Sequence, residues 1–400
     1  MANIFVINAH WNNHGDEAAI RAMIDELITD NNISLQIRSA EVLNFNYEDI
    51  KIVKEYPRKR FIPEMLMLIM SKGKLVFSRD GKEFVDYINN CDLVVHAPGG
   101  PSIGDIYKKT ELSYLLKFML IDKLGKPYIF YAPSAGPFKS RLRNVFRRKI
   151  YRNAQRVIFR ESLSKTYYDE LIPDNDAIVT LDSAFQHKID CSFYESLLNE
   201  NEELKQFVAD PNLVIGLTVT DLKWHPEYGK DSTLSDKIYN GTADIVSRLI
   251  NKGYKLLFIP QLFGEQNDAN YMRKFNKENC FVLSENYDCY FQQYIISKIH
   301  AVIGMRYHSN IFAAKMCTPF ISISYEQKMS GFIKKINYEE YCIDIRDYSA
   351  NRVLETFDLL EENYPQIRSH LIEINDQLYL ESHRTTDITR ELLRDMKVNL

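Results

Sequence analysis

The residues best suited to chemistry lie in one short segment, Ala301–Asn310, which reads Ala-Val-Ile-Gly-Met-Arg-Tyr-His-Ser-Asn. Its aliphatic start predicts a buried strand, and Ser309 or Asn310 is placed to cap the helix that follows. If the backbone stays extended, Arg306 and His308 point to the same side, because side chains alternate along a strand. A guanidinium and an imidazole at a helix N-terminus form an anion site, and the imidazole can transfer a proton near neutral pH. We expect these two residues to hold an anionic, phosphate-bearing donor; a surface salt bridge and a helix cap are the alternative interpretation.

Two further segments place cations at the carboxyl ends of predicted strands. One strand ends in Ser324–Tyr325, and Lys328 follows on the next loop. Another strand ends in Arg160. Three cations at strand ends suit a ligand that carries both a phosphate and a carboxylate. The alternatives are a solvated Lys328 and an ion pair of Arg160 with Glu161 or Asp182.

Glycine-rich junctions follow two other predicted strands. Gly99 and Gly100 lie in the first, and Ser134 lies in the second, where backbone N–H groups can approach a ligand closely. Neither junction matches GxGxxG or GxxxxGK[ST], so no dinucleotide or P-loop site is expected. Near the start, Gly15 favours a tight turn and Asp16 fits the N-cap of the first helix. The Asp16 carboxylate is also suited to accept a proton or a hydrogen bond from a sugar hydroxyl.

Composition limits the class of protein. With 45% apolar and 26% charged residues, the 400-residue chain has an ordinary globular composition, and its length predicts two domains. A net charge of −4 gives no reason to expect nucleic-acid binding. Six scattered cysteines without a CxxC pair indicate reduced thiols. We expect no metal site, because His10 and His14 have no further ligands at metal-binding spacing, and no cofactor.

The chain also lacks the sequence signals of export and of membrane insertion. The opening residues run directly into a strand pattern, so no signal peptide is expected. The most apolar run, residues 61–70, has about half the ~20 residues that a membrane span needs, and it contains a glutamate. These features predict a cytoplasmic protein.

The elements that position these residues alternate between short apolar runs and helical patterns, which predicts α/β architecture with two Rossmann-like domains and mainly parallel sheets. We expect an N-terminal domain over residues 1–195, a C-terminal domain over 211–345, and helices over 350–400 that pack back on the first domain. The polar, acidic stretch Ser192–Asp210 is the predicted linker. Strands are expected at Ile4–Asn8, Ser34–Ile37, Leu93–His96, Tyr128–Ala132, Val157–Phe159, Ala177–Leu181, Leu213–Val219, Lys255–Pro260, Ala301–Gly304 and Pro319–Ser324.

Taken together, these segments resemble the polysaccharide pyruvyl transferase family over most of residues 5 to 332. The most specific part runs from Gly304 to Lys328, with Gly-Met-Arg-Tyr-His at its start and Ser-Tyr-Glu-Gln-Lys at its end. The supporting segments are Asn13–Ala18, the Gly99-Gly100 loop, Pro133–Pro137, Arg160–Ser162 and Leu181–Phe185.

The resemblance implies a GT-B-like arrangement of two Rossmann-like domains and a ketal pyruvyl transferase. Such an enzyme moves pyruvate from phosphoenolpyruvate onto two hydroxyls of a sugar in a capsule or exopolysaccharide, or in its lipid-linked precursor, and forms a cyclic ketal. By this resemblance His308 is the general acid/base, Asp16 assists at the acceptor hydroxyls, and three cations hold the donor's phosphate and carboxylate. The implied catalytic and substrate-binding residues are His308, Arg306, Asp16, Arg160, Lys328, Ser324, Tyr325, Gly99, Gly100 and Ser134.

Two other classes of function fit the same residues. A GT-B-type glycosyltransferase would use a nucleotide sugar, and Glu265 or Asp268 would then bind the ribose hydroxyls. A non-catalytic sugar or phosphate sensor would use Arg306 and His308 for binding without turnover.

One segment suggests peripheral contact with the inner face of the cell membrane. Residues 139–156 carry eight basic residues and no acid, and an apolar stripe at helical spacing begins at Leu142, Val145 and Phe146. Such a contact would suit an acceptor carried on a lipid diphosphate. The alternative, which we favour from sequence, is a solvated basic face with the apolar stripe in the core.

Overall fold

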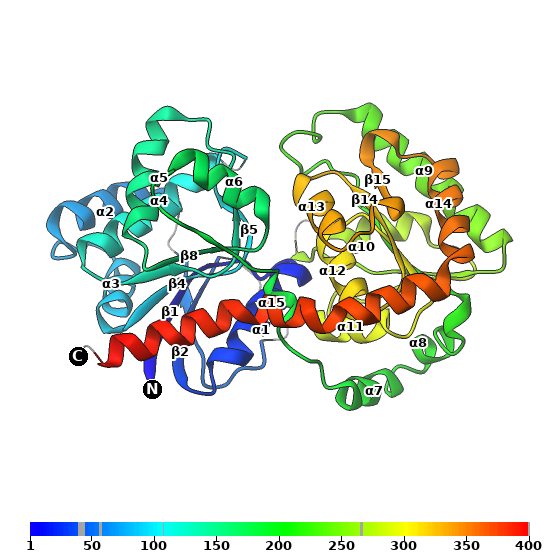
Figure 1. Ribbon diagram of the computed structural model, residues 1–400, viewed down its shortest axis with the longest axis horizontal. Coiled ribbons are helices and arrows are strands. Elements are labelled where there is room, and N and C mark those ends of the chain that lie inside the picture. Colours follow the sequence, from blue (N-terminus) through cyan, green and yellow to red (C-terminus); the bar gives the residue numbers. More distant parts are fainter. Residues whose placement is uncertain (39–44, 56–57, 107, 265–266, 399–400) are drawn as a thin grey trace. The chain divides into compact units, whose positions relative to one another are not determined.

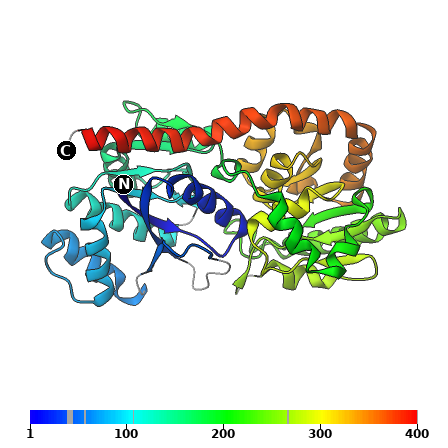
Figure 2. The ribbon, with the colours of Figure 1, turned by 90° about the horizontal axis from the view of Figure 1, so that it is seen from below.

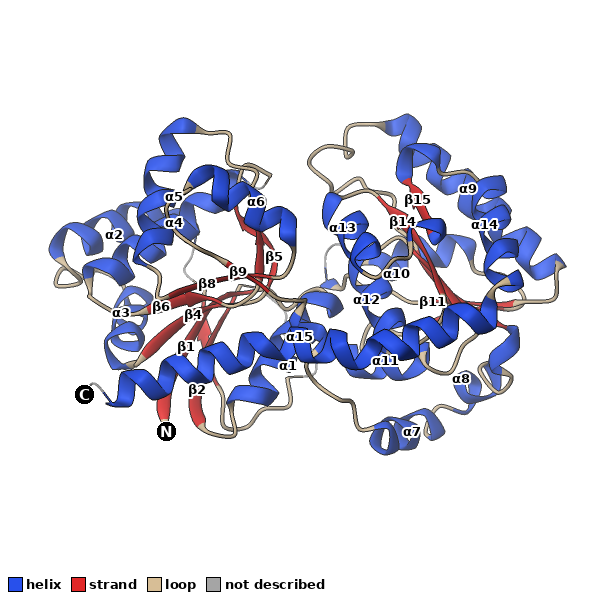
Figure 3. Ribbon diagram, in the orientation of Figure 1, coloured by secondary structure: helices blue, strands red, loops and turns tan. Residues whose placement is uncertain are grey.

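The computed structural model describes residues 1–38, 45–55, 58–106, 108–264 and 267–398. The chain divides into two compact units. The first comprises Met1–Trp11, Asp16–His187 and Tyr379–Leu400, and the second comprises Asn12–Gly15 and Lys188–Leu378. Each unit is a Rossmann-like domain with a parallel sheet, as the alternating sequence pattern predicts (Figures 1 and 3).

The first unit is built on a parallel sheet with the strand order β3-β2-β1-β4-β6-β8-β9. A small second sheet pairs β5 with β7 beside it. The strands are β1 (Ala2–Ala9), β2 (Asn31–Ile37), β3 (Lys51–Lys54), β4 (Leu93–His96), β5 (Gly99–Ile103), β6 (Tyr128–Phe130), β7 (Pro133–Ala135), β8 (Arg156–Phe159) and β9 (Ile178–Val179). The helices are α1 (His14–Leu27), α2 (Arg58–Ser71), α3 (Arg79–Asn90), α4 (Lys108–Lys123), α5 (Arg141–Asn153) and α6 (Ser162–Leu171).

Helices cover both faces of this sheet. The side chains of Phe5, Val94 and Phe159 point to one face, where they pack with residues of α2 to α6 in a continuous apolar core. Helix α1 lies on the other face with the last part of the C-terminal helix (Figure 1). Because side chains alternate along a strand and both faces are covered, the strands read as nearly continuous apolar runs.

The second unit repeats the same topology, with the strand order β12-β11-β10-β13-β14-β15. Helices α9 and α14 lie together on one face of the sheet, and α11 and α12 lie on the other (Figure 3). The strands are β10 (Val214–Thr218), β11 (Lys255–Phe258), β12 (Cys280–Val282), β13 (Ala301–Gly304), β14 (Phe320–Ser324) and β15 (Cys342–Asp344). The helices are α7 (Cys191–Asn199), α8 (Glu202–Phe207), α9 (Ser232–Asn251), α10 (Asp268–Met272), α11 (Cys289–Ile296), α12 (Tyr307–Lys315), α13 (Gln327–Lys335) and α14 (Ala350–Glu362).

The structure corrects the predicted linker and the predicted tail. The stretch Ser192–Asp210 is not a linker, because most of it forms α7 and α8, which are capped by Asp190 and Asn201 and belong to the second unit. Helix α14 also belongs to the second unit, and only the part of α15 (Tyr364–Val398) from Tyr379 onward belongs to the first. Figure 2 shows α15 as one continuous helix.

Candidate functional site

In each unit, chemically capable residues lie where the strand order reverses. The central strand β10 has β11 on one side and β13 on the other, and β1 likewise lies between β2 and β4. In open parallel sheets, ligands bind beyond the carboxyl ends of the strands at such a reversal. Arg306 and His308 follow β13 at this position in the second unit, and His10 and Asp16 follow β1 in the first.

Arg306 is a buried cation with a buried partner. Its guanidinium donates to the Asp268 carboxylate, with Nη2–Oδ1 at 2.5 Å and Nε–Oδ2 at 3.2 Å. Its plane lies over the Trp224 ring, 4.8 Å from the ring centre. Burial alone would lower the pKa of Arg306, but Asp268 and Tyr325 raise it above its ordinary value. The guanidinium is therefore held charged in one orientation.

Asp268 is fixed in turn by its own loop. Its carboxylate accepts the backbone N–H groups of Gln261 and Leu262, at 3.1 and 2.9 Å. The same loop accepts the backbone N–H of His14 at the Gln261 carbonyl, 2.8 Å away. The sequence pattern offered Asp268 only as a ribose ligand, whereas the structure shows it as the partner of Arg306. Glu265 lies outside the described residues.

His308 is placed by Gly15. A Cβ built on Gly15 would come within 1.9 Å of His308 Nδ1, so that position admits no side chain without displacing the imidazole. His308 is almost completely buried. The backbone becomes helical at Tyr307, so α12 begins before Ser309 and Arg306 is its N-cap residue. The prediction that an extended backbone aligns Arg306 with His308 is therefore wrong, as is the prediction that Ser309 or Asn310 caps the helix.

Lys328 belongs to a chain of charged groups at the end of β14. Its ammonium lies 2.5 Å from the Glu326 carboxylate, which accepts a hydrogen bond from His225 at 3.1 Å. Burial alone would raise the pKa of Glu326, but Lys328 and His225 outweigh it and lower the pKa to about 2. Lys328 lies in the first turn of α13 rather than on a loop, and its ammonium is 5.6 Å from the centre of the Tyr307 ring.

The remaining predicted residues of this unit complete the wall of the cluster. Tyr325 is buried and packs edge-on against Trp224 and His225. The Ser324 hydroxyl donates to the Glu326 carbonyl at 3.3 Å. The N-cap side chains of α12 and α13, Arg306 and Glu326, accept no hydrogen bond from their own helices. Two helix N-termini therefore direct their positive ends to this edge of the sheet.

In the first unit, Asp16 lies beside the Gly99 loop. A Cβ on Gly99 would come 3.1 Å from Asp16 Oδ1, and Gly99 has a φ of +139° that side chains rarely adopt. A Cβ on Gly100 would meet nothing within 4 Å. Helix α1 begins at His14, so Asp16 lies in its first turn and is not the N-cap that the sequence suggested. The Asn13 carboxamide instead accepts the Gly15 N–H at 2.8 Å.

Arg160 is buried in a network of its own at the end of β8. It donates to the Asp182 carboxylate at 2.6 Å and to the Ser134 hydroxyl at 2.8 Å, and Glu161 lies 3.4 Å away. Ser134 donates to Glu161 at 3.0 Å. The ion pair with Glu161 and Asp182, which was the alternative interpretation of Arg160, is thus present. The role of Arg160 in binding the donor stays a prediction.

Sequence reasoning missed a second polar group near Asp16. His10 lies 2.8 Å from the Tyr114 hydroxyl, which also accepts a hydrogen bond from Arg38. Burial lowers the pKa of His10, and Asp16 opposes that shift. The only available signal was the position of His10 directly after β1, because its partners come from other elements.

One cavity of the structure lies elsewhere, in the first unit. Its volume is about 640 Å³, and it is lined by residues at the amino ends of β1, β2 and β3 and along α3, including Asn3, Asn32, Lys51 and Tyr87. Ligand sites of this topology form at the opposite edge, so we do not assign the candidate site to this cavity. Within the described part of the chain, no group of three or more His, Cys, Asp or Glu residues is arranged to hold a metal ion. None of the described helices is both long and apolar enough to cross a bilayer.

Comparison with known proteins identifies the family. The family model "Polysaccharide pyruvyl transferase" matches residues 13–327, which include the residues of both clusters except His10 and Lys328. The chain belongs to the polysaccharide pyruvyl transferase family. The amylovoran biosynthesis protein AmsJ of Erwinia amylovora is 21% identical over 429 residues, an alignment that covers 98% of this chain and 100% of that protein. The sequence resemblance is confirmed, and the chain is a transferase of polysaccharide biosynthesis.

Solved structures support the fold. The UDP-GlcNAc 2-epimerase of Neisseria meningitidis, bound to UDP-GlcNAc, matches with a TM-score of 0.60 at 14% identity, over 98% of this chain and 100% of that one. A glycosyltransferase of Rickettsia africae matches with a TM-score of 0.59 at 12% identity, over 98% of each chain. At such identities the likeness shows the fold alone, which is the predicted GT-B-like fold of two Rossmann-like domains.

Proposed function

We propose that this protein transfers pyruvate from phosphoenolpyruvate to a sugar of a polysaccharide, or of its lipid-linked precursor, and forms a cyclic ketal. The observation that carries the proposal is the cluster of Arg306, His308 and Lys328 near the strand-order reversal of the second unit. The chain that carries this cluster belongs to the polysaccharide pyruvyl transferase family. The cluster combines fixed cations, a buried imidazole and two helix N-termini, which together suit a small anion that must be protonated.

The charge balance of the cluster bears on how the donor binds. Asp268 and Glu326 neutralise Arg306 and Lys328, so the site is less positive than the cations alone would make it. Arg306 has five donor N–H groups, and its bonds to Asp268 hold its plane in position while other donors face the ligand. Glu326 bonds to both Lys328 and His225. If Lys328 moves to bind the donor phosphate, the Glu326 carboxylate therefore keeps its hydrogen bond from His225.

The proposed reaction begins with a proton from His308 to the methylene carbon of phosphoenolpyruvate. The adjacent carbon then becomes oxocarbenium-like, and the oxygen of a sugar hydroxyl bonds to it as that hydroxyl loses its proton. The bond from this carbon to the phosphate oxygen breaks, and phosphate leaves against Arg306 and Lys328. A second sugar hydroxyl adds to the same carbon, loses its proton and closes the ketal ring. Of the two hydroxyl protons, one returns to His308 and the other leaves with the phosphate.

For the acceptor, the proposal assigns the edge of the first unit that carries Asp16, Gly99 and Gly100. Asp16 is partly exposed there. When it is ionised, its carboxylate accepts hydrogen bonds and donates none, which suits the donor hydroxyls of a sugar. The glycine backbone permits close approach because a side chain at Gly99 would crowd Asp16. His10 lies close enough to Asp16 for their charges to interact, so it is a second candidate for the base at these hydroxyls.

The test is release of inorganic phosphate from phosphoenolpyruvate by the purified protein, with and without an added glycan acceptor. We expect release that depends on the acceptor, together with a product whose mass increases by one pyruvate ketal. A glycosyltransferase would leave phosphoenolpyruvate intact and consume a nucleotide sugar, whereas a sensor would bind without turnover. Either result would refute the proposal.

The His308→Ala variant tests the assigned acid/base. Loss of general acid–base catalysis typically costs 10²–10⁴-fold in rate, so turnover should fall at least about 100-fold. Binding of phosphoenolpyruvate should change little, because the cations remain. Unchanged turnover in this variant would remove His308 from the mechanism.

A further inference from the structure

Helix α5 presents an apolar face to solvent. Leu142 is 78% exposed, Val145 60% and Phe146 39%, and these positions recur at the spacing that places them on one side of a helix. Lys149 continues the same side. The sequence favoured a core position for this stripe, and the structure contradicts that for its first three residues.

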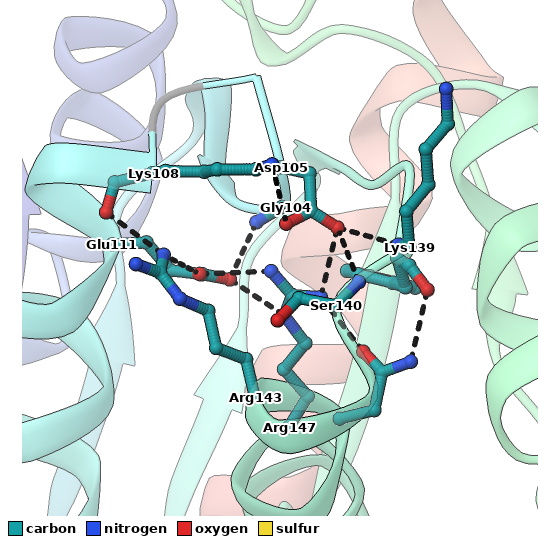
Figure 4. Close-up of polar contacts among 10 residues, drawn as sticks. Gly104, Asp105, Lys108, Glu111, Lys139, Ser140, Arg143 and Arg147 are labelled. Carbon is teal, nitrogen blue, oxygen red and sulfur yellow. Dashed lines mark hydrogen bonds and ion pairs between the residues drawn. The ribbon is translucent and has the colours of Figure 1, made fainter.

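A buried arginine explains the rotation of the helix. Arg147 points into the protein, where it donates to Glu111 at 2.7 Å and 2.8 Å and to Asp105 at 3.2 Å. Arg143 donates to the same Glu111 carboxylate at 2.7 Å. Figure 4 shows the Arg147 guanidinium reaching both acids and the Arg143 guanidinium reaching Glu111, while the Lys139 side chain extends away from them. Because Arg147 faces inward, Leu142 and its neighbours must face outward.

The start of α4 adds to this face. Arg143 donates to the Lys108 carbonyl at 2.8 Å, which holds the first turns of α4 and α5 together. Near that contact, Leu112 is 42% exposed and Ile106 is also exposed. We define the α4–α5 patch as Ile106, Leu112, Leu142, Val145 and Phe146 with the exposed cations Lys108, Lys139, Arg141 and Lys149.

The charges of the patch have one sign. Its nearest acids, Asp105 and Glu111, are buried and bonded to Arg147 and Arg143. Asp174, which follows α6, is paired with Arg152 near the far end of α5. Exposed apolar side chains ringed by lysine and arginine are the combination that binds anionic lipid, because the apolar groups insert and the cations meet the headgroups.

The place of the patch in the fold gives it a use. In a βα unit the helix begins at the edge where the preceding strand ends, so the first turns of α4 and α5 lie at the carboxyl edge of the sheet. The Gly99 and Ser134 segments lie at this same edge, because they directly follow β4 and β6. A surface that held the patch would therefore lie on the same side of the first unit as these loops.

We propose that the α4–α5 patch docks this protein on an anionic membrane surface. This inference does not depend on the reaction above, because it rests on the exposed face of α5 and the charges around it. It deepens the role of the first unit by keeping the protein where a lipid-linked acceptor would be found.

The test is co-sedimentation of the whole protein with vesicles, without any substrate. The vesicles contain phosphatidylcholine alone or phosphatidylcholine with phosphatidylglycerol, each at low and at high salt. We expect binding to the anionic vesicles at low salt, with at least a tenfold weaker partition at high salt and on neutral vesicles.

Two double variants separate the apolar and charged contributions. Leu142→Ser with Val145→Ser removes exposed apolar groups, and Lys139→Glu with Arg141→Glu reverses two charges. Each should weaken partition about tenfold or more, and neither alters a buried side chain. The matched control variants change exposed positions elsewhere and should bind as the unaltered protein does. They are Ile372→Ser with Leu380→Ser on α15, and Lys205→Glu with Lys230→Glu.

Three outcomes would overturn the proposal. The first is no binding to anionic vesicles at low salt. The second is equal loss of binding in the control variants, which would indicate a non-specific charge effect. The third is light scattering that shows a dimer which only the Leu142 and Val145 variant dissociates, without vesicle binding, because the patch would then join two copies of the chain.

Discussion

At the scale of single residues, the position of the imidazole depends on a glycine far away in the sequence. Gly15 packs so closely on His308 that even a methyl group would overlap the ring. Gly15 also donates to Asn13, which holds the turn before α1. A reaction that needs a proton donor in a fixed place is therefore sensitive to a position that never contacts the reacting atoms.

Gly15→Ala should reduce turnover more than stability. Overpacking costs about 1–3 kcal/mol, whereas a shift of about 1 Å in a catalytic group costs on the order of 100-fold in rate. Steady-state kinetics and urea denaturation measure the two effects. The control is Gly331→Ala in α13, where a Cβ would meet nothing within 4 Å, so turnover should stay near its original value and stability should not fall. Full activity of Gly15→Ala would show that His308 tolerates displacement.

Another prediction at the scale of single residues concerns the pKa of His96, which is a buried histidine. Its Nδ1 donates to the Ala97 carbonyl at 2.7 Å, its Nε2 accepts from Ser102 at 2.6 Å, and its ring stacks on Phe118. Burial lowers the pKa of His96 from 6.5 to about 4, against the Ala97 hydrogen bond. The unfolded chain therefore binds a proton more readily than the folded chain between these two pH values.

Because of this difference, the free energy of unfolding should fall as the pH drops from about 6.5 to about 4, by up to about 3 kcal/mol from His96. Above pH 6.5 the imidazole is neutral in both states and contributes no pH dependence. His96→Phe with Ser102→Ala should remove this part of the acid sensitivity without leaving a buried hydroxyl unpaired. Urea titrations at several pH values measure it, and identical slopes in both proteins would contradict it.

The charged residues of the second unit's cluster could be named from sequence, but the partners of Arg306 and Lys328 could not. Arg306, His308 and Lys328 could be named because each follows an apolar strand pattern. Asp268 and Glu326 could not be assigned as their counter-charges, since ion pairs between separate loops leave no periodic signal in one sequence. The start of α12 at Tyr307 was also missed, because the N-cap residue, Arg306, is not one of the usual capping types.

At the scale of secondary-structure elements, α5 shows why a correct helix can be assigned the wrong buried face. The apolar stripe and the basic residues were read correctly, and the helix lies within the segment 139–156 that the sequence indicated. Hydrophobic periodicity then favoured Leu142 inside. The buried Arg147 is neutralised by Asp105, which precedes α4, and by Glu111 in the first turn of α4. Because these acids are remote from α5 in sequence, only the folded chain reveals the pairing.

Arg147→Met should destabilise the first unit strongly. It leaves Glu111 and Asp105 buried with less compensation, and breaking a buried ion pair in this way costs about 3–5 kcal/mol. Arg152→Met is the matched control on the same helix, because Arg152 pairs with the exposed Asp174 and its loss should cost less than about 1 kcal/mol. Equal urea midpoints for the two variants would contradict this interpretation of α5.

At the scale of the whole molecule, the alternation of strands and helices was enough to predict two Rossmann-like domains. Buried parallel strands and their crossover helices are both marked by local patterns, so the elements could be placed within a few residues. The exchange of segments between the units could not be predicted this way. Residues Asn12–Gly15 and Tyr379–Leu400 each belong to the unit that is remote in sequence.

The last part of α15 should be required for the stability of the first unit. Ser382 donates to the Asp182 carbonyl at 2.6 Å, Thr386 bonds to Tyr131 and Gln186, and Leu392 and Leu393 are buried. A chain ending at Leu378 should therefore lose on the order of 10 °C or more in the Tm of that unit. A chain ending at Lys397, which loses the exposed Val398, is the control, and similar Tm values for both would contradict the prediction.

The exchange of segments also sets an order of events during synthesis. Asn12–Gly15, which belong to the second unit, are translated long before the strands of that unit. The residues from Tyr379 onward, which complete the first unit, are translated only after Lys188–Leu378 of the second unit. The first unit therefore cannot be completed before the second unit has been translated, so the two units cannot fold one after the other in chain order.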